Sequence, residues 1–299
     1  MRSKEPKHGS IRSVARGNRR VTPNPDANRT LERMPPAPAR PVVIKIGGRS
    51  LEAPGAPEEL AAEVASLSGE ALLVHGGGRD VSDWCKRLGI TPRFIDGLRV
   101  TDPHTLEVAV AVLSGLANKR LVAVLREAGV DAVGLSALDG GMVEVEPHPD
   151  AATLGAVGQV RAVEPALLET LLLQGRTPVL SSIGAIQGRL LNLNADELAA
   201  SLAGALRAHT LVLLSDTPGL RLQGVVVPTL AVSELEETLR RPDVSDGMVA
   251  KLHAARKAIA LGVAQVRIAA WSGPGTLKAL IAGTGIGTTL IAADPAQVH

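Results

Sequence analysis

Two short apolar segments near the start of the sequence each run into glycines, a pattern that can bind phosphate. Segments 42–46 and 71–75 are typical of buried strands, and glycine lets the backbone approach a ligand closely and offer its N–H groups. The glycines concerned are Gly47, Gly48, Gly76 and Gly77. Lys45 lies inside the first segment, where an ammonium group is unfavourable unless an anion or a carboxylate pairs with it. The alternative is a lysine that reaches water from the strand end, but the adjacent glycines favour contact with a ligand.

Three polar residues alternate with apolar ones further along the chain: Asn192, Asn194 and Asp196. Strand alternation would place them on one face, so that two amides and a carboxylate converge. Asp196 also precedes a helix-like pattern and could simply cap that helix. Because the two asparagines are harder to explain by capping, we interpret the three residues as a binding face.

Three further polar segments complete the set of candidate site residues. Lys251 lies in the first turn of a helix predicted over 248–261, where the helix dipole disfavours a cation. Contact with an anion would explain it, and a solvated lysine is the alternative. Arg99 lies in a loop, and its forked guanidinium suits a carboxylate, although an ordinary surface arginine also fits. Ser215 and Asp216 follow an apolar segment, at the kind of strand end where open α/β sheets bind ligands.

The composition restricts the class of protein. The chain of 299 residues is long enough for one large α/β domain or two lobes, and 45% of it is hydrophobic. Its aromatic side chains are Trp84, Trp271 and Phe94, which argues against binding of single-stranded nucleic acid by stacking. We find no apolar run of about 18 residues, so we expect no membrane span. Cys85 is the single cysteine, which excludes an intrachain disulfide and fits a cytoplasmic protein.

Charge is distributed unevenly along the chain. Residues 1–41 contain ten basic and three acidic residues, whereas the remainder contains 22 basic and 27 acidic ones. The first 41 residues show no apolar period, so we predict a disordered basic tail. They also lack the apolar segment of a secretory signal.

Strand-like and helix-like patterns alternate after the tail. Strands are predicted over 42–46, 71–75, 131–136, 178–182, 210–215, 265–271 and 288–293. Helices are predicted over 57–67, 79–88, 103–128, 165–174, 196–207, 233–240, 248–261 and 275–282, with Asp102 as the N-cap of the third. This order predicts an α/β fold in which helices cover both faces of a mainly parallel sheet, interrupted by hairpin-like segments at 141–163 and 183–195.

Taken together, these segments resemble the amino acid kinase superfamily, and within it the acetylglutamate kinase family. The resemblance runs from about residue 42 to 293 and rests on the order and spacing of several short motifs. Among them are Ile-Lys-Ile-Gly-Gly, Val-His-Gly-Gly-Gly, Gly-Leu-Arg-Val-Thr, Leu-Asn-Leu-Asn-Ala-Asp, Leu-Leu-Ser-Asp and Asp-Gly-Met-Val-Ala-Lys. It implies a three-layer αβα sandwich with two lobes: 42–208 would bind the acetylated amino acid and form a homodimer, and 209–299 would bind the nucleotide.

The resemblance also implies an activity and a role for each candidate residue. The activity is phosphorylation of the side-chain carboxylate of N-acetyl-L-glutamate by ATP, the second step of arginine biosynthesis. Lys45 and Lys251 would neutralise the transferring phosphoryl group, and Asp196 would orient both lysines. Among the remaining residues, the four glycines would donate backbone N–H groups and Arg99 would bind the α-carboxylate. Asn192 would hold the acetylated amino acid with Asn194 beside it in the binding site, and Ser215 and Asp216 would lie at the nucleotide end.

No metal-binding residues and no general base are expected. The nucleophile is already an ionised carboxylate, so His75 can be a packed histidine, and Mg²⁺ would be held mainly by the nucleotide phosphates and water. A kinase for carrier-bound aminoadipate or glutamate is the nearest alternative, but its larger acceptor would need a more basic groove. A non-catalytic amino-acid-binding regulator with the same fold would have no need for Lys45, Lys251 and Asp196 together.

Overall fold

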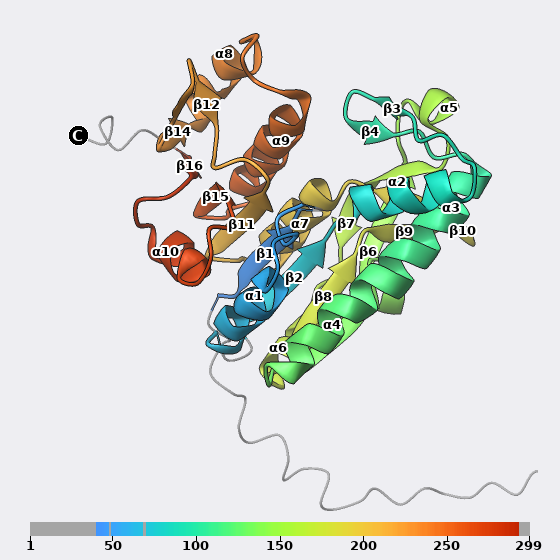
Figure 1. The fold of residues 1–299 in the computed structure, drawn as a ribbon, viewed down its shortest axis with the longest axis horizontal. Coiled ribbons are helices and arrows are strands. Elements are labelled where there is room, and N and C mark those ends of the chain that lie inside the picture. Colours follow the sequence, from blue (N-terminus) through green and yellow to red (C-terminus); the bar gives the residue numbers. More distant parts are fainter. Residues whose placement is uncertain (1–39, 48, 68–69, 293–299) are drawn as a thin grey trace, which may run out of the picture. The chain divides into compact units, whose positions relative to one another are not determined.

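The computed structural model describes residues 40–47, 49–67 and 70–292, so nearly all of the predicted tail 1–41 lies outside the described residues. The central sheet has eight strands in the order β14-β16-β15-β11-β1-β2-β8-β5 (Figure 1). They are β1 Val42–Ile46, β2 Ala71–His75, β5 Ala132–Ser136, β8 Thr177–Ser181, β11 Thr210–Ser215, β14 Thr229–Ala231, β15 Gln265–Ala270 and β16 Thr288–Ile291. Within this sheet β15 and β16 pair antiparallel and the other neighbours pair in parallel, which confirms the predicted sheet.

Helices cover both faces of the sheet because side chains alternate along its strands. Ile44 belongs to the core on one face, and Val43 belongs to the core on the other. The first face carries α1 (Ala56–Ala65), α4 (Asn118–Glu127) and α10 (Thr276–Ala282). The second carries α6 (Ala166–Leu173), α7 (Ala195–Ala205), α8 (Leu235–Leu239) and α9 (Asp246–Ala260). Lys45 shares the face of Val43 and therefore points toward α7.

The helix predicted over 103–128 is continuous but not uniform. It consists of α3 (Pro103–Val110), a π-helical segment (Ala111–Ala117) and α4, and Asp102 caps it by accepting from Thr105 N–H at 2.9 Å. The π-helical segment was not predicted, because its residues fit the same apolar period as an α-helix. Such segments often occur at functional sites.

This helix also corrects one expectation. Pro103–Glu127 is long and apolar enough, by length and composition alone, to cross a membrane, although we expected no such stretch. In the structure its α4 portion packs against α1, β5 and β8, and its α3 portion packs against α2 (Gly78–Arg87). These contacts place one side of the helix against the packed body, and 33% of its most apolar 18-residue window is buried.

The hairpin-like segments form a second sheet with the order β6-β7-β10-β9. Its strands are β6 Val143–Pro147, β7 Val157–Val163, β9 Ile183–Ile186 and β10 Arg189–Leu193. Two short ribbons pair β3 Phe94–Ile95 with β4 Leu98–Arg99 and β12 Arg221–Leu222 with β13 Val225–Val226. The remaining short helices are η3 Asp139–Gly141, α5 Ala151–Leu154 and η4 Val232–Glu234. Cys85 is buried within α2, as expected of a packed residue.

Candidate active site

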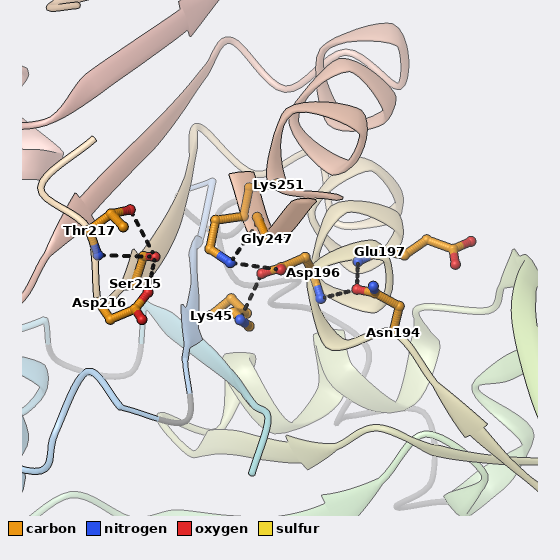
Figure 2. A network of polar contacts seen from close by, with 9 residues as sticks. All are labelled: Lys45, Asn194, Asp196, Glu197, Ser215, Asp216, Thr217, Gly247 and Lys251. Atoms are coloured by element: carbon orange, nitrogen blue, oxygen red, sulfur yellow. Dashed lines mark hydrogen bonds and ion pairs between the residues drawn. The ribbon is translucent and has the colours of Figure 1, made fainter. Parts of the chain in front are cut away.

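Two lysines from distant parts of the chain meet on one carboxylate at the carboxyl end of β1. Lys45 Nζ lies 2.8 Å from Asp196 Oδ1, and Lys251 Nζ lies 3.3 Å from Asp196 Oδ2 (Figure 2). The contact with Lys45 is close by distance but lacks the angles of a hydrogen bond, whereas Lys251 donates one to Oδ2. Lys45 and Asp196 are each 6% exposed. The alternative of a lysine reaching water is therefore wrong for Lys45.

Charge and burial act in opposite directions within this cluster. Burial alone would raise the pKa of the Asp196 carboxyl, but the charges of Lys45 and Lys251 outweigh it and hold that pKa below its usual value. Burial lowers the pKa of Lys45, and the nearby Lys251 lowers it further, while Asp196 opposes both. The cluster of two ammonium groups and one carboxylate keeps a net positive charge that an anion can neutralise.

The segment 192–196 changes structure within five residues. Strand β10 ends at Leu193, and Asn194 is the N-cap of α7, where its Oδ1 accepts from Asp196 N–H at 2.9 Å and from Glu197 N–H at 3.2 Å. The predicted strand alternation therefore does not reach Asp196, and the alternative that Asp196 caps the helix is wrong. Helix geometry, not strand alternation, points its carboxylate at the lysines.

Lys251 is explained by the same carboxylate. Helix α9 begins at Asp246, so Lys251 lies in its second turn, and the reasoning from the first turn was wrong. Its Nζ also lies 3.4 Å from Gly247 O, in the turn before it. Lys251 therefore pairs with Asp196 inside the site, and the alternative of a solvated lysine is wrong.

A cavity of about 240 Å³ collects most of the predicted acceptor residues. We call it the acceptor cavity. Seven of the predicted site residues line it: Lys45, Gly76, Gly77, Arg99, Asn192, Asn194 and Asp196. These residues lie in or directly after β1, β2, β4 and β10 and in the first turn of α7, and the fold brings them together at one cavity.

Arg99 brings a buried cation to this cavity. It is 8% exposed, its Nη2 donates to Gly78 O at 2.5 Å and to Ser82 Oγ at 2.8 Å, and its guanidinium carbon lies 4.6 Å from the centroid of the Phe94 ring. Nη1 has no hydrogen-bond partner among the residues that the structure describes. A buried guanidinium nitrogen without a partner fits a carboxylate ligand, and the surface-arginine alternative is wrong.

A second cavity of about 640 Å³ lies beyond the lysines, and we call it the phosphate cavity. Lys45, Gly47, Ser215, Asp216 and Lys251 line it, so Lys45 belongs to both cavities. Gly48, the remaining residue predicted for this end, lies outside the described residues.

An ion pair that the sequence did not predict closes part of the phosphate cavity. Arg49 pairs with Asp216, whose carboxylate also accepts from Ser215 Oγ at 3.2 Å. Burial would raise the pKa of Asp216, but a backbone N–H and the charge of Arg49 hold it below its usual value. The pair joins a loop after β1 to the end of β11, two segments 167 residues apart, which no local pattern could reveal.

The backbone of the glycines differs from the expectation. Gly47 N–H donates to Leu214 O at 3.0 Å and Gly76 N–H donates to Ile46 O at 3.1 Å, so both groups continue the hydrogen bonding of the sheet, which contradicts the prediction that they donate to phosphate. Small size still matters at Gly47, where a Cβ would lie 2.8 Å from Leu214 O.

Metal ligands are sparse in this site. Among the described residues, no group of three or more His, Cys, Asp or Glu side chains could hold a metal ion. Asp196 contacts two ammonium groups, and the carboxylates that line the phosphate cavity are Asp83 and Asp216.

Residues 40–270 match the model of the Amino acid kinase family, and the chain belongs to this family. It is 41% identical over 254 residues to the acetylglutamate kinase of Methanopyrus kandleri, an alignment that covers 81% of this chain and 98% of the relative. It is 43% identical over 249 residues to the acetylglutamate kinase of Rubrobacter xylanophilus, which covers 83% of this chain and 96% of the relative.

A solved structure shares the fold. The N-acetylglutamate synthase of Neisseria gonorrhoeae, complexed with coenzyme A and N-acetyl-glutamate, superimposes with a TM-score of 0.74 at 27% identity. The match covers 85% of this chain and 60% of the synthase. The family and fold expected from the sequence are confirmed.

Proposed function

We propose that the protein transfers the γ-phosphoryl group of ATP to the side-chain carboxylate of N-acetyl-L-glutamate, forming N-acetyl-L-glutamyl 5-phosphate and ADP. Relatives at about 40% identity over most of the chain are acetylglutamate kinases. The observation that carries the proposal is the position of Lys45, which borders both the acceptor cavity and the phosphate cavity. A carboxylate in the first and a γ-phosphate in the second would meet at this ammonium group.

The reaction brings two anions together, so charge neutralisation and positioning are the main requirements. An acceptor carboxylate oxygen forms the new bond to phosphorus while the bond to the ADP oxygen breaks, and no proton has to move. Lys45 and Lys251 would neutralise the charge on the transferring group, and Asp196 would keep both lysines in place. Arg99 would bind the α-carboxylate through its free Nη1.

Mg²⁺ supplies charge neutralisation on the nucleotide phosphates when it is bound. Because the described residues offer no carboxylate cluster for it, the phosphates and water would provide most of its ligands, with Asp216 and Asp83 as the carboxylates that line that cavity.

We further propose that residues 42–208 bind the acceptor and form a homodimer, and that residues 209–299 bind the nucleotide. The sheet order supports this division, since β1, β2, β8 and β5 lie together and β11, β15, β16 and β14 follow on the other side (Figure 1). The activity would serve arginine biosynthesis in the cytoplasm.

The test traps the acyl phosphate with hydroxylamine. Purified protein with ATP, Mg²⁺ and N-acetyl-L-glutamate should give a hydroxamate, whereas N-acetyl-L-aspartate, one methylene shorter, should give far less. Absence of product with N-acetyl-L-glutamate, together with product from aminoadipate on a carrier protein, would overturn the proposed acceptor.

A further inference from the structure

His75, the last residue of β2, uses both ring nitrogens in hydrogen bonds. Nδ1 lies 2.8 Å from Gly76 O, and Nε2 lies 3.1 Å from Asn118 Nδ2. A carbonyl oxygen can only accept, so Nδ1 carries the proton and Nε2 accepts from the amide of Asn118. His75 is 4% exposed, and burial lowers its pKa, which favours this neutral form.

Asn118 is fixed from the opposite side. Its Nδ2 also donates to Val179 O at 2.9 Å, and Leu135 O lies 3.3 Å away. If the amide group were reversed, its oxygen would face these two carbonyl oxygens and the ring nitrogen of His75, which is unfavourable. Asn118 is fully buried and follows directly after the π-helical segment. Gly134 leaves room for it, because a Cβ there would overlap Asn118 Oδ1. The backbone of the sheet therefore determines which nitrogen of His75 carries the proton.

The peptide group between Gly76 and Gly77 is held by His75. Gly76 N–H donates to Ile46 O, Gly76 O accepts from His75, and Gly77 O accepts from Val81 N–H at 2.9 Å. The peptide is trans, so the Gly77 N–H points away from the carbonyl that His75 holds. Within the described part of the chain that N–H has no acceptor, and Gly77 lines the acceptor cavity.

We propose that His75 and Asn118 are positioning residues that aim the Gly77 N–H at the phosphoryl group during transfer. His75 acts through the Gly76 carbonyl and touches neither substrate nor the reacting atoms. Leu113 of the π-helical segment supports the same peptide, because a Cβ on Gly77 would lie 2.7 Å from its Cδ2. A donor held before the substrate arrives needs no reorganisation when negative charge develops on the transferring oxygens.

The kinetic test rests on the proposed function and uses two amide substitutions. In His75→Asn the side-chain nitrogen falls near the position of Nδ1 and can still donate to Gly76 O, whereas in His75→Gln it falls near Nε2 and cannot. We expect kcat within about 3-fold of the native value for His75→Asn and about 10- to 100-fold lower for His75→Gln, with both KM values nearly unchanged. Ser114→Ala, which removes a 2.8 Å contact between Ser114 of the π-helical segment and Ser181 of β8, should leave kcat unchanged. Equal losses in the two His75 variants, or a loss confined to KM, would overturn the proposal.

A spectroscopic test uses the native protein without substrates. In ¹⁵N-histidine-labelled protein, the His75 signals are identified by their disappearance in His75→Gln, and we expect a protonated Nδ1 and an unprotonated Nε2 at pH 7. A protonated Nε2, in either the other tautomer or the imidazolium, would overturn the proposal. A native protein that forms no hydroxamate would overturn the proposed function alone, because the tautomer is measured independently of any acceptor.

Discussion

The two ends of the site differ in how firmly the protein holds the arginine that each contributes, although the buried Lys45 and Lys251 also line the phosphate cavity. At the acceptor end, Arg99 is almost completely buried, and a small cavity surrounds it. At the phosphate end, the Arg49 and Asp216 side chains are 61% and 38% exposed, and the cavity is more than twice as large. Buried charges with few partners discriminate strongly between ligands, whereas exposed pairs are screened by water. The comparison indicates that the acceptor end determines specificity and that the phosphate end mainly attracts charge.

The strongest test of this comparison removes the lysine that borders both cavities. Lys45→Ala should lower kcat by about 100- to 1000-fold, because the transferring group loses a preorganised positive charge. Steady-state kinetics checks this, and thermal unfolding confirms that the variant is folded. Lys257→Ala is the matched control, since Lys257 forms a 2.8 Å ion pair with Glu197 on the neighbouring helix and lines neither cavity. Equal losses in the two variants would contradict the assignment.

The next test compares one arginine at each end. Arg99→Lys should raise the KM for N-acetyl-L-glutamate by about 10- to 100-fold and leave the KM for ATP unchanged, because the single nitrogen of lysine cannot occupy both the Nη2 position bonded to Gly78 and Ser82 and the Nη1 position offered to the ligand. Arg49→Lys should change only the KM for ATP, and only by a few-fold. If Arg49→Lys affected the acceptor more than Arg99→Lys, the assignment of the two ends would be reversed.

A third test concerns the carboxylate between the two ends. The folded-state pKa of Asp196 lies below its unfolded value of about 3.9, so its ionised form contributes stability above that pH and loses the contribution as the pH falls through the folded pKa. Urea unfolding should therefore show a stability difference between native protein and Asp196→Asn that is large at pH 7 and shrinks on acidification. Asp131→Asn, in a pair with Arg126 that is more than half exposed on both sides, should change stability by no more than about 1 kcal/mol at any pH. A difference for Asp196→Asn that grew on acidification would contradict this sign.

The smallest expected effect separates two neighbouring asparagines at the acceptor end. Asn194→Ala should lower the free energy of unfolding by about 1 kcal/mol through loss of the α7 cap. Asn194→Ser, which can still cap the helix, should recover most of it. Asn192→Ala should instead raise the KM for the acceptor, because Asn192 lines the cavity and is held by Thr101 Oγ1 at 3.2 Å. The reverse outcome would show that Asn194 is the main ligand-binding amide.

The sequence predicted those parts of the site that follow from local patterns. An apolar strand containing Lys45 must lie in the sheet, and parallel strands place the residues after them at one edge. For this reason the convergence of Lys45 and Gly77 at one cavity could be expected from the strand pattern, whereas the places of Asn192 and Arg99, which lie outside the central sheet, were implied only by the family resemblance. The strand predictions for the central sheet succeeded for the same reason, except for β14, whose three residues are too few to show a period. The two-residue strands of the short ribbons were missed as well.

The features that were missed depend on contacts distant in sequence. Whether Gly47 and Gly76 have free N–H groups depends on the carbonyls of Leu214 and Ile46, which only the strand register reveals. The change from strand to helix between Leu193 and Asp196 also decides where the carboxylate points. In the same way, Asn118 shows its function only when the sheet places His75 beside it.

The scarcity of aromatic residues gives this protein two natural fluorophores at informative places. Trp84 and Trp271 are its only tryptophans, and there is no tyrosine. Trp84 lies on α2, and the first residue of this helix, Gly78, borders both cavities. The guanidinium carbon of Arg87 lies 5.2 Å from the centroid of the Trp84 ring. Trp271 follows β15 in the other half of the sheet and has a buried Nε1 without a partner among the described residues. A single Trp→Phe replacement therefore leaves an intrinsic emission signal from one half alone, so that conformational changes on addition of acceptor or nucleotide can be followed without an attached label.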